Sequence, residues 1–327
     1  MTARLVLDVG GTKMAAAVVA EDHSIVDRAV LRTPVAADAE TLYDAAVFVL
    51  HAALAVAAVP VDALGVGCGG PMRWPSGEVS PLNIPGWRDF PLRDRLAEEF
   101  GLPTRLSNDA VCLTVGEYVL GNSRSVGNCM GMLVSTGVGA GLIIDGRLVM
   151  GASGNAGHIG HVVVEPDGPE CRCGGRGCLE AVARGPALVQ WAVAQGWRPP
   201  ADGEADAVRL AESARAGDAV ATAAFRRCGE AVGTALAGAV ALLDLRTVAL
   251  GGGVSRAADL LMPAVYDAFE RHAGLEFVRR CRVVLASPDA GLVGAAALFD
   301  DPWWPAVTDL LEQRSTGADH GVRTPLL

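Results

Sequence analysis

Residues 5–20, with the sequence LVLDVGGTKMAAAVVA, decide the fold class of this chain. Apolar residues run up to the Gly10-Gly11 pair and resume after it, which predicts a strand over Arg4–Val9, a tight turn and a second strand over Lys13–Ala20. The segments that follow predict, in chain order, a third strand over Ile25–Thr33, a helix over Thr41–Ala58 and a buried strand over Ala63–Gly67. Three strands, a helix and a further strand form an α/β unit.

The same pattern returns in residues 131–144, GMLVSTGVGAGLII. An apolar strand over Gly131–Ser135 precedes a Gly-rich turn over Thr136–Gly141 and a strand over Leu142–Ile144, and a turn at residues 145–147 leads into Leu148-Val149. The sequence therefore looks internally duplicated. Two related lobes that each offer a Gly-rich hairpin to a shared cleft suit a ligand with a phosphate chain held between them.

The repeat predicts two domains around a central cleft. We expect a smaller N-terminal α/β lobe over residues 1–115 and a larger α/β lobe over residues 116–288, with the boundary near Val111–Gly121. A Gly- and Ala-rich helix near residues 289–300 is expected to return to the first lobe. The tail at residues 301–327 receives no assignment.

The composition excludes several classes of protein. Of the 327 residues, 51% belong to the AVILMFWYC set and 20% are charged, which excludes a disordered chain and a coiled coil. The net charge is −10, and no stretch of the sequence gathers the positive charge that binding of nucleic acid requires. The longest apolar run, Ala45–Val59, is shorter than the roughly 20 residues of a membrane span, and no export signal precedes Arg4. We therefore expect a cytoplasmic protein that binds neither nucleic acid nor membranes.

Two Gly-rich turns are candidate nucleotide contacts. In Asp8–Lys13, DVGGTK, adjacent glycines let backbone N–H groups approach an anion, Thr12 adds a hydroxyl, and Asp8 can hold Mg²⁺. An ordinary β-hairpin explains the same residues equally well. Gly251-Gly252-Gly253, after an apolar strand over Thr247–Leu250, leaves a similar choice between a nucleotide contact and a flexible connection.

Gly65, Gly67 and Gly70 match the G-x-G-x-x-G pattern of dinucleotide-binding proteins. That motif must open a helix, whereas here Pro71 and Trp74-Pro75 follow. We expect instead a tight loop at which the backbone approaches a ligand. Asn83 continues this loop region with a polar side chain and is assigned to substrate binding.

Ser107-Asn108-Asp109 follows a short strand over Thr104–Leu106 and starts a helical segment over Ala110–Leu120. A helix cap is the commonest reason for these residue types at a helix start. The functional alternative makes Asp109 a general base that accepts the proton of a hydroxyl as it attacks phosphorus. The company of two Gly-rich hairpins favours the general base.

His161, Cys171, Cys173 and Cys178 form the strongest local signal. A set of three thiolates and one imidazole binds Zn²⁺ tetrahedrally, and the spacing C-x-C-x₄-C with glycines lets a short loop wrap the ion. Because protein would fill all four positions, this zinc is expected to be structural. The alternatives are unrelated thiols beside a surface His, or a redox role for the cysteines.

Gly157-His158-Ile159-Gly160-His161, followed by C-x-C-G-x-x-G-C-L-E over Cys171–Glu180, is the most specific part of the sequence. With the turns above, it resembles the ROK family of sugar kinases from about Leu5 to Phe299. The resemblance implies the two-lobed actin-like ATPase (ribonuclease H-like) fold. It also implies Mg²⁺- and ATP-dependent transfer of the γ-phosphoryl group to the 6-hydroxyl of a hexose, by a homodimer or homotetramer.

The resemblance assigns roles by position, and Asp109 matches the catalytic base. The residues assigned to the sugar are Gly70, Asn83, Asn108, His158, His161 and Glu180. Those assigned to the nucleotide and its Mg²⁺ are Asp8, Gly10, Gly11, Thr12, Lys13, Ser135, Thr136, Gly137, Gly139, Gly251, Gly252 and Gly253. His161, Cys171, Cys173 and Cys178 match the zinc ligands.

One departure leaves the sugar open. The family usually has Glu where this chain has His158, and His at this point also resembles bacterial N-acetylmannosamine kinases. Some ROK proteins are repressors with an N-terminal DNA-binding helix-turn-helix, whereas this chain starts its first strand at Arg4. A non-catalytic sugar-binding or regulatory protein, and polyphosphate in place of ATP as donor, are the remaining alternatives.

Overall fold

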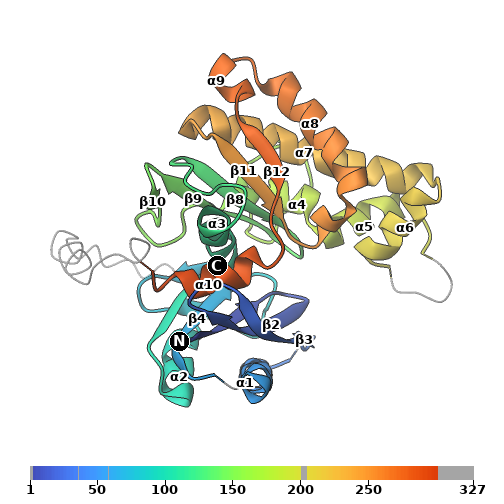
Figure 1. Ribbon diagram of the computed structural model, residues 1–327. Helices are drawn as coiled ribbons and strands as arrows, with labels where there is room; N and C mark the ends of the chain where they lie inside the picture. The colour runs from blue at the N-terminus through green and yellow to red at the C-terminus, as the bar shows by residue number, and fades with distance from the viewer. Residues whose placement is uncertain (1–2, 36, 58, 200–204, 301–327) are drawn as a thin grey trace, which may run out of the picture.

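The computed structural model describes residues 3–35, 37–57, 59–199 and 205–300, so the tail at 301–327 lies outside the described residues. Two lobes stack on either side of two central helices, α3 and α10 (Figure 1). The elements up to the first central helix are β1 (Ala3–Val9), β2 (Lys13–Ala20), β3 (Ile25–Arg32), α1 (Ala39–Val56), β4 (Val61–Cys68), β5 (Met72–Arg73), β6 (Glu78–Val79), α2 (Leu92–Phe100), β7 (Thr104–Asn108) and α3 (Asp109–Val119).

The second half of the chain builds the larger lobe. Its elements are β8 (Cys129–Val134), β9 (Val138–Ile144), β10 (Arg147–Leu148), α4 (Leu179–Ala183), α5 (Gly185–Ala194), α6 (Ala207–Arg215), α7 (Ala219–Leu243), β11 (Thr247–Gly251), α8 (Ala258–His272), α9 (Glu276–Arg279), β12 (Arg282–Leu285) and α10 (Ala290–Ala297). Single 3₁₀ turns lie at Ile159–His161 and Val254–Ala257.

The two sheets have the same topology, which confirms the predicted duplication. The strand order is β3-β2-β1-β4-β7 in one lobe and β10-β9-β8-β11-β12 in the other. In each sheet the first three strands pair antiparallel and the last two continue in parallel. The carboxyl ends of β1 and β8 carry the two Gly-rich turns, and both ends face the space between the lobes.

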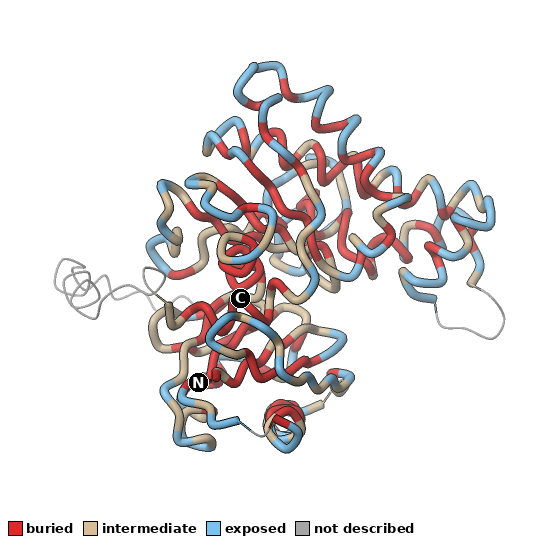
Figure 2. Tube along the Cα trace, in the orientation of Figure 1, coloured by how far each residue is buried: buried red, intermediate tan, exposed pale blue. Residues whose placement is uncertain are grey.

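The last helix of each half packs on the other half. α3 follows β7 of the small lobe but packs on β8 and β9, whereas α10 follows β12 of the large lobe but packs on β1 and β4. The two helices cross at backbone distance, because a Cβ at Gly294 would lie 1.6 Å from the Cys112 carbonyl oxygen. Buried residues fill this crossing, as Figure 2 shows. The predicted lobe boundary at residue 115 falls inside α3.

Two sequence predictions about glycines are wrong. The Gly-rich stretch expected as a turn up to Gly141 belongs mostly to β9, because residues 138–144 pair in register with β8 and only Ser135–Gly137 turn. Gly65 lies inside β4 rather than in a ligand loop. A Cβ there would lie 2.1 Å from the Ala295 carbonyl oxygen, so this glycine admits α10 and not a ligand.

α1 begins two residues earlier than expected, because Asp38 caps it by accepting a hydrogen bond from the Thr41 amide at 2.8 Å. By length and composition α1 is apolar enough to cross a membrane, the only such helix among the described residues. In the structure one face, with Leu42, Ala46 and Leu50, packs into the core over β1, β2 and β3. This packing is that of a core helix in a globular lobe.

Candidate active site

A cavity of about 1330 Å³ lies between the lobes. Its walls come from the β1–β2 turn, the β8–β9 turn, the start of α3, the loop after β11 and the first turns of α5 and α6. The residues predicted for sugar and nucleotide all line it: Asp8, Gly10, Gly11, Thr12, Lys13, Gly70, Asn83, Asn108, Asp109, Ser135, Thr136, Gly137, Gly139, His158, His161, Glu180, Gly251, Gly252 and Gly253. The three cysteines of the predicted metal site lie outside the cavity wall.

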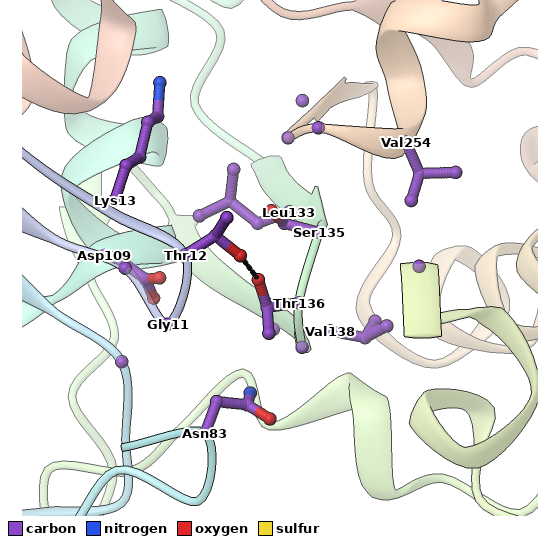
Figure 3. A pocket seen from close by; sticks show the side chains of 18 of the residues that line it. Gly11, Thr12, Lys13, Asn83, Asp109, Leu133, Ser135, Thr136, Val138 and Val254 are labelled. Carbon is purple, nitrogen blue, oxygen red and sulfur yellow. Dashed lines mark hydrogen bonds between the residues drawn. The ribbon is translucent and has the colours of Figure 1, made fainter. Parts of the chain in front are cut away.

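The two Gly-rich turns meet at their tips. The hydroxyl oxygens of Thr12 and Thr136 share a hydrogen bond of 2.7 Å, although the residues belong to different lobes (Figure 3). Gly11 is closely surrounded there, since a Cβ would lie 3.0 Å from that of Asn83 and 3.1 Å from the Thr136 methyl. Two Gly-rich turns with threonine hydroxyls thus lie together in the cavity wall, and such turns can bind a phosphate chain.

Asp109 is the first residue of α3, and Asn108 is its cap. Both side chains accept from the Ala110 amide, Asn108 Oδ1 at 3.0 Å and Asp109 Oδ1 at 2.9 Å. Asn108 therefore provides the helix cap, and the neighbouring Asp109 is the candidate general base. The carboxylate of Asp109 faces the cavity (Figure 3). A second oxygen, Oδ2, has no such bond and lies near Gly69.

Two carboxylates share the cavity floor and have altered pKa values. Burial and, to a smaller extent, the charge of Asp8 together raise the pKa of Asp109 from 3.8 to about 7. Burial, partly opposed by the Lys13 ammonium, raises the pKa of Asp8 from 3.8 to about 6. Both side chains keep some surface open to the cavity, so they can meet a ligand. A group with a pKa near neutrality is suited to take a proton from a weak acid and return it.

Glu180 offers one carboxylate oxygen to the cavity. Its Oε2 accepts from the Val138 amide at 2.9 Å, while its buried Oε1 has no hydrogen-bond partner among the described residues. Gly137 keeps the place open, because a Cβ there would lie 2.5 Å from the Asn83 amide nitrogen and 2.9 Å from Glu180 Oε2. A buried oxygen without a partner leaves an acceptor for a ligand hydroxyl.

His158, Asn108 and Gly70 form the neighbouring wall. A Cβ on Gly70 would lie 3.0 Å from His158 Nε2 and 3.1 Å from Asn108 Nδ2, so a side chain here would crowd these polar atoms. Burial lowers the pKa of His158, and its Nδ1 bonds the Asn155 carbonyl at 2.9 Å. Several hydrogen-bonding groups therefore surround the space in front of Asp109, as recognition of a polyhydroxyl ligand requires.

The four predicted metal ligands come together. One ligand atom from each of His161, Cys171, Cys173 and Cys178 lies within 4.8 Å of the others. The Cys173 and Cys178 sulfurs are 3.8 Å apart, and Cys171 Sγ lies 3.7 Å from His161 Nδ1. Tetrahedral zinc with Zn–S bonds of about 2.3 Å requires sulfurs about 3.8 Å apart, so the set fits Zn²⁺.

The loop that carries the three cysteines also contacts the smaller lobe. Arg172, between two of the cysteines, donates to Asn83 Oδ1 at 3.2 Å. Asn83 therefore turns its Nδ2 donor toward Gly137 and the cavity.

Sequence reasoning missed the apolar wall opposite the Gly251–Gly253 turn. Pro186, Val189 and Val193 of the α5 segment and Val208 of α6 line this end of the cavity. Val208 is 64% exposed and Val193 39% exposed, and with the other two residues they give this end of the cavity an apolar surface. No local motif marks these residues, and their grouping beside the Gly-rich turn becomes visible in the fold.

Duplicated α/β lobes with Gly-rich turns over a shared cavity define a protein of the two-lobed actin-like ATPase fold. The ROK family pattern matches residues 4–302, and the chain belongs to this family.

Three of the similar proteins are named as sugar kinases. Thermotoga maritima glucokinase is 33% identical over 311 residues, covering 90% of this chain and 96% of the relative. An N-acetylmannosamine kinase of Haemophilus influenzae is 35% identical over 322 residues, with 97% and 99% covered. The structure of a ROK family glucokinase from Streptomyces griseus in complex with glucose and AMPPNP superposes with a TM-score of 0.79, at 34% identity, covering 90% of this chain and 98% of that one.

Proposed function

We propose that this protein is an ATP-dependent sugar kinase that transfers the γ-phosphoryl group to the 6-hydroxyl of a hexose. The observation that carries the proposal is the Asp109 carboxylate, which lies in one cavity with two phosphate-type turns. The names of the similar proteins, glucokinase and N-acetylmannosamine kinase, support the same reaction class.

Asp109 acts as the general base in this proposal. Its carboxylate accepts the proton of the hydroxyl while the hydroxyl oxygen bonds the γ-phosphorus and the bond to the ADP oxygen breaks. A pKa of about 7 keeps a large fraction ionised at neutral pH while leaving the carboxylate basic enough to take the proton. Asn108 and Glu180 hold the sugar through hydrogen bonds, and Glu180 Oε1 is the acceptor that lacks a protein partner.

The nucleotide is expected to lie along the rest of the cavity. The backbone donors and hydroxyls of the β1–β2 and β8–β9 turns bind the phosphates, and the valines of α5 and α6 with Gly251–Gly253 enclose the base and ribose. Asp8 would supply the hard oxygen ligand that Mg²⁺ prefers, and the ion would neutralise charge on the phosphate oxygens.

ATP suits this cavity better than polyphosphate. Among the described lining residues the only Lys and Arg are Lys13, Arg28 and Arg256, and Arg28 is already paired with Asp289 at 2.8 Å. A long polyanion requires a track of cations, whereas an apolar wall at one end serves a nucleotide base.

Zinc is assigned a structural role. Four protein ligands complete its tetrahedral shell and leave no position for water, so the ion would hold the loop that carries Arg172 and the turn that carries His161. These residues would then keep Asn83 in place, together with the cavity wall of Gly70, Asn108 and His158, which we call the sugar wall.

The sugar is either glucose or an N-acetylhexosamine such as N-acetylmannosamine. The observation that favours the second is His158, a single neutral acceptor where the family usually presents a carboxylate. An ADP-release assay with glucose, mannose, N-acetylglucosamine and N-acetylmannosamine decides between them through kcat/KM. Absence of turnover with all four, despite sugar binding by calorimetry, would instead indicate a non-catalytic sugar-binding protein.

The cytoplasmic location and the homodimer or homotetramer stay predictions. Multi-angle light scattering of the purified protein tests the oligomeric state.

A further inference from the structure

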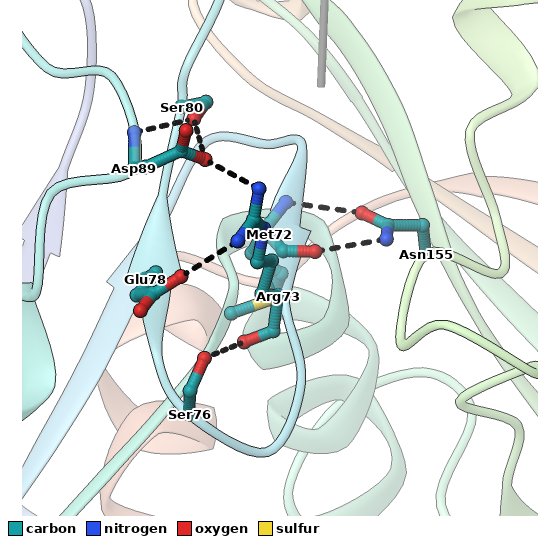
Figure 4. Close-up of polar contacts among 7 residues, drawn as sticks. All are labelled: Met72, Arg73, Ser76, Glu78, Ser80, Asp89 and Asn155. Carbon is teal, nitrogen blue, oxygen red and sulfur yellow. Dashed lines mark hydrogen bonds and ion pairs between the residues drawn. The ribbon is translucent and has the colours of Figure 1, made fainter. Parts of the chain in front are cut away.

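Asn155 joins the two lobes beside the proposed sugar wall. Its Oδ1 accepts from the Met72 amide at 3.1 Å, and its Nδ2 donates to the Met72 carbonyl at 2.9 Å (Figure 4). The orientation of the amide follows from these partners, because an N–H can only donate and a C=O can only accept. The side chain thus pairs with Met72 as a neighbouring strand residue would, across 83 positions of sequence.

The hairpin that contains Met72 has strand pairing and ion pairs of its own. β5 and β6 form a two-stranded sheet of their own, in which Arg73 lies between Glu78 at 3.4 Å and Asp89 at 3.3 Å (Figure 4). On the other side of the contact, the Trp74 side chain fills the space where a Cβ of Gly154 would lie. Met72 is buried and only two residues from Gly70 in the sugar wall. The contact between Met72 and Asn155 therefore connects the segment that follows Gly70 to the loop that precedes His158.

The same residue determines which nitrogen of His158 carries the proton. His158 Nδ1 lies 2.9 Å from the Asn155 carbonyl, which can only accept, so Nδ1 carries the hydrogen. Nε2 is then an acceptor, and it converges with Asn108 Nδ2 on the space above Gly70. A carboxylate at this position would accept from any direction, whereas an imidazole accepts at Nε2 only in one tautomer and one ring orientation.

We infer that Asn155 is a positioning residue for the sugar, acting through His158, in a role that rests on the proposed kinase function. Its side chain fixes the loop on Met72, and its carbonyl holds the His158 ring with Nε2 as an acceptor for a hydroxyl or amide N–H of the substrate. The contact keeps His158 Nε2, the neutral acceptor, beside Asn108 Nδ2 when the ligand binds.

The test is Asn155→Asp, which keeps the shape but replaces the Nδ2 donor by an oxygen that faces the Met72 carbonyl. Asn128→Asp is the matched control, since Asn128 also accepts from a main-chain amide, that of Asp145, and donates to a main-chain carbonyl, that of Asp244, outside the cavity. We expect the sugar KM of Asn155→Asp to rise about tenfold, the size that one or two lost hydrogen bonds produce, while the ATP KM changes less than twofold. Asn128→Asp is expected to change neither.

A double-mutant cycle separates positioning from general damage. If Asn155 acts through His158, Asn155→Asp raises the sugar KM by less than twofold in a His158→Gln background. An equal rise in both backgrounds, or no rise beyond that of the Asn128→Asp control, overturns the inference.

A measurement of the histidine tautomer on the unmutated protein does not depend on turnover. The ¹⁵N spectrum of the imidazoles, with the signals of His158 identified by their loss in His158→Gln, is expected to show Nδ1 protonated and Nε2 bare. A spectrum with Nε2 protonated overturns the inference whether or not the protein phosphorylates a sugar. Failure of every hexose in the ADP-release assay, with this tautomer observed, would refute the kinase function alone.

Discussion

Replacing Asp109 by Asn tests the proposed base with minimal change of shape. Positioned general bases contribute about 10²–10⁴ in rate, which corresponds to about 3–5 kcal/mol of barrier. The amide oxygen of Asn can still accept the Ala110 N–H bond that Asp109 Oδ1 accepts at 2.9 Å, so α3 should keep its start. We therefore expect kcat to fall by about 10²–10⁴ in Asp109→Asn. The sugar KM is expected to stay within about threefold, because Asn108 and Glu180 are untouched.

The same substitution should stabilise the fold, and the sign follows from the pKa. Because the pKa of Asp109 is about 7 in the folded protein and 3.8 ordinarily, its ionised form is disfavoured on folding. This penalty is absent below pH 4, grows as the pH rises to 7 and is then constant. The full difference corresponds to about 4 kcal/mol, which contact with cavity water reduces, so we expect Asp109→Asn to gain about 1–3 kcal/mol at pH 8 in Mg²⁺-free buffer. The gain should shrink at pH 5.

The assays are steady-state ADP release and thermal unfolding at the two pH values. Asp145→Asn is the matched control, since Asp145 is exposed at φ 50° in the β9–β10 turn, a conformation that Asn tolerates, and lies outside the cavity. It should behave like the parent protein. A kcat of Asp109→Asn within tenfold of the parent would refute the assignment of the base. A loss of stability at pH 8 would refute the reasoning about its burial.

The remaining predictions concern pH, metal and packing. The pKa of about 7 at Asp109 predicts that kcat/KM rises with pH through about 7 and then levels, because the base must be ionised; a profile that is flat from pH 5.5 to 8.5 would contradict this. Cys173→Ser should lower the zinc content measured by mass spectrometry and weaken sugar binding in calorimetry; stoichiometric zinc in the variant would remove Cys173 from the ligand set. Gly294→Ala should destabilise the protein by about 1–3 kcal/mol or more, since its Cβ would overlap the Cys112 carbonyl of α3. Gly238→Ala, at an exposed site of α7 with nothing within 4 Å, should instead stabilise it by up to about 1 kcal/mol, and equal melting temperatures for the two variants would disprove this view of the helix crossing.

The helix crossing has a mechanical consequence for the proposed kinase. α3 begins at the base Asp109 and packs on the large-lobe strands β8 and β9, so the base is attached to the sheet that carries the second phosphate turn. α10 attaches the small-lobe strands β1 and β4 to the large lobe in the reciprocal way. The base, at the junction of β7 and α3, is therefore attached to both lobes.

Local sequence was sufficient for those features that depend on neighbours in the chain. Alternation of apolar strands with Gly-rich turns predicted β1, β2 and the duplication, because the period of a strand and the backbone freedom of glycine act within a few residues. The cluster of candidate metal ligands was predictable for the same reason, since three of its four residues lie within eight residues of one another. The Ser-Asn-Asp segment was ambiguous locally; in the structure Asn108 caps α3, and Asp109 lines the cavity.

The tertiary structure alone decided what depends on residues far apart in the chain. Whether a glycine admits a ligand or a helix cannot be read from its neighbours, as Gly65 under α10 and Gly70 in the sugar wall demonstrate. The hydrogen bond between Thr12 and Thr136 spans 124 positions and that between Met72 and Asn155 spans 83, and no local pattern indicates either pairing. The physical reason is that burial and hydrogen bonding are fixed by which surfaces the two lobes bring together, and that choice belongs to the packing of α3 and α10 rather than to any single segment.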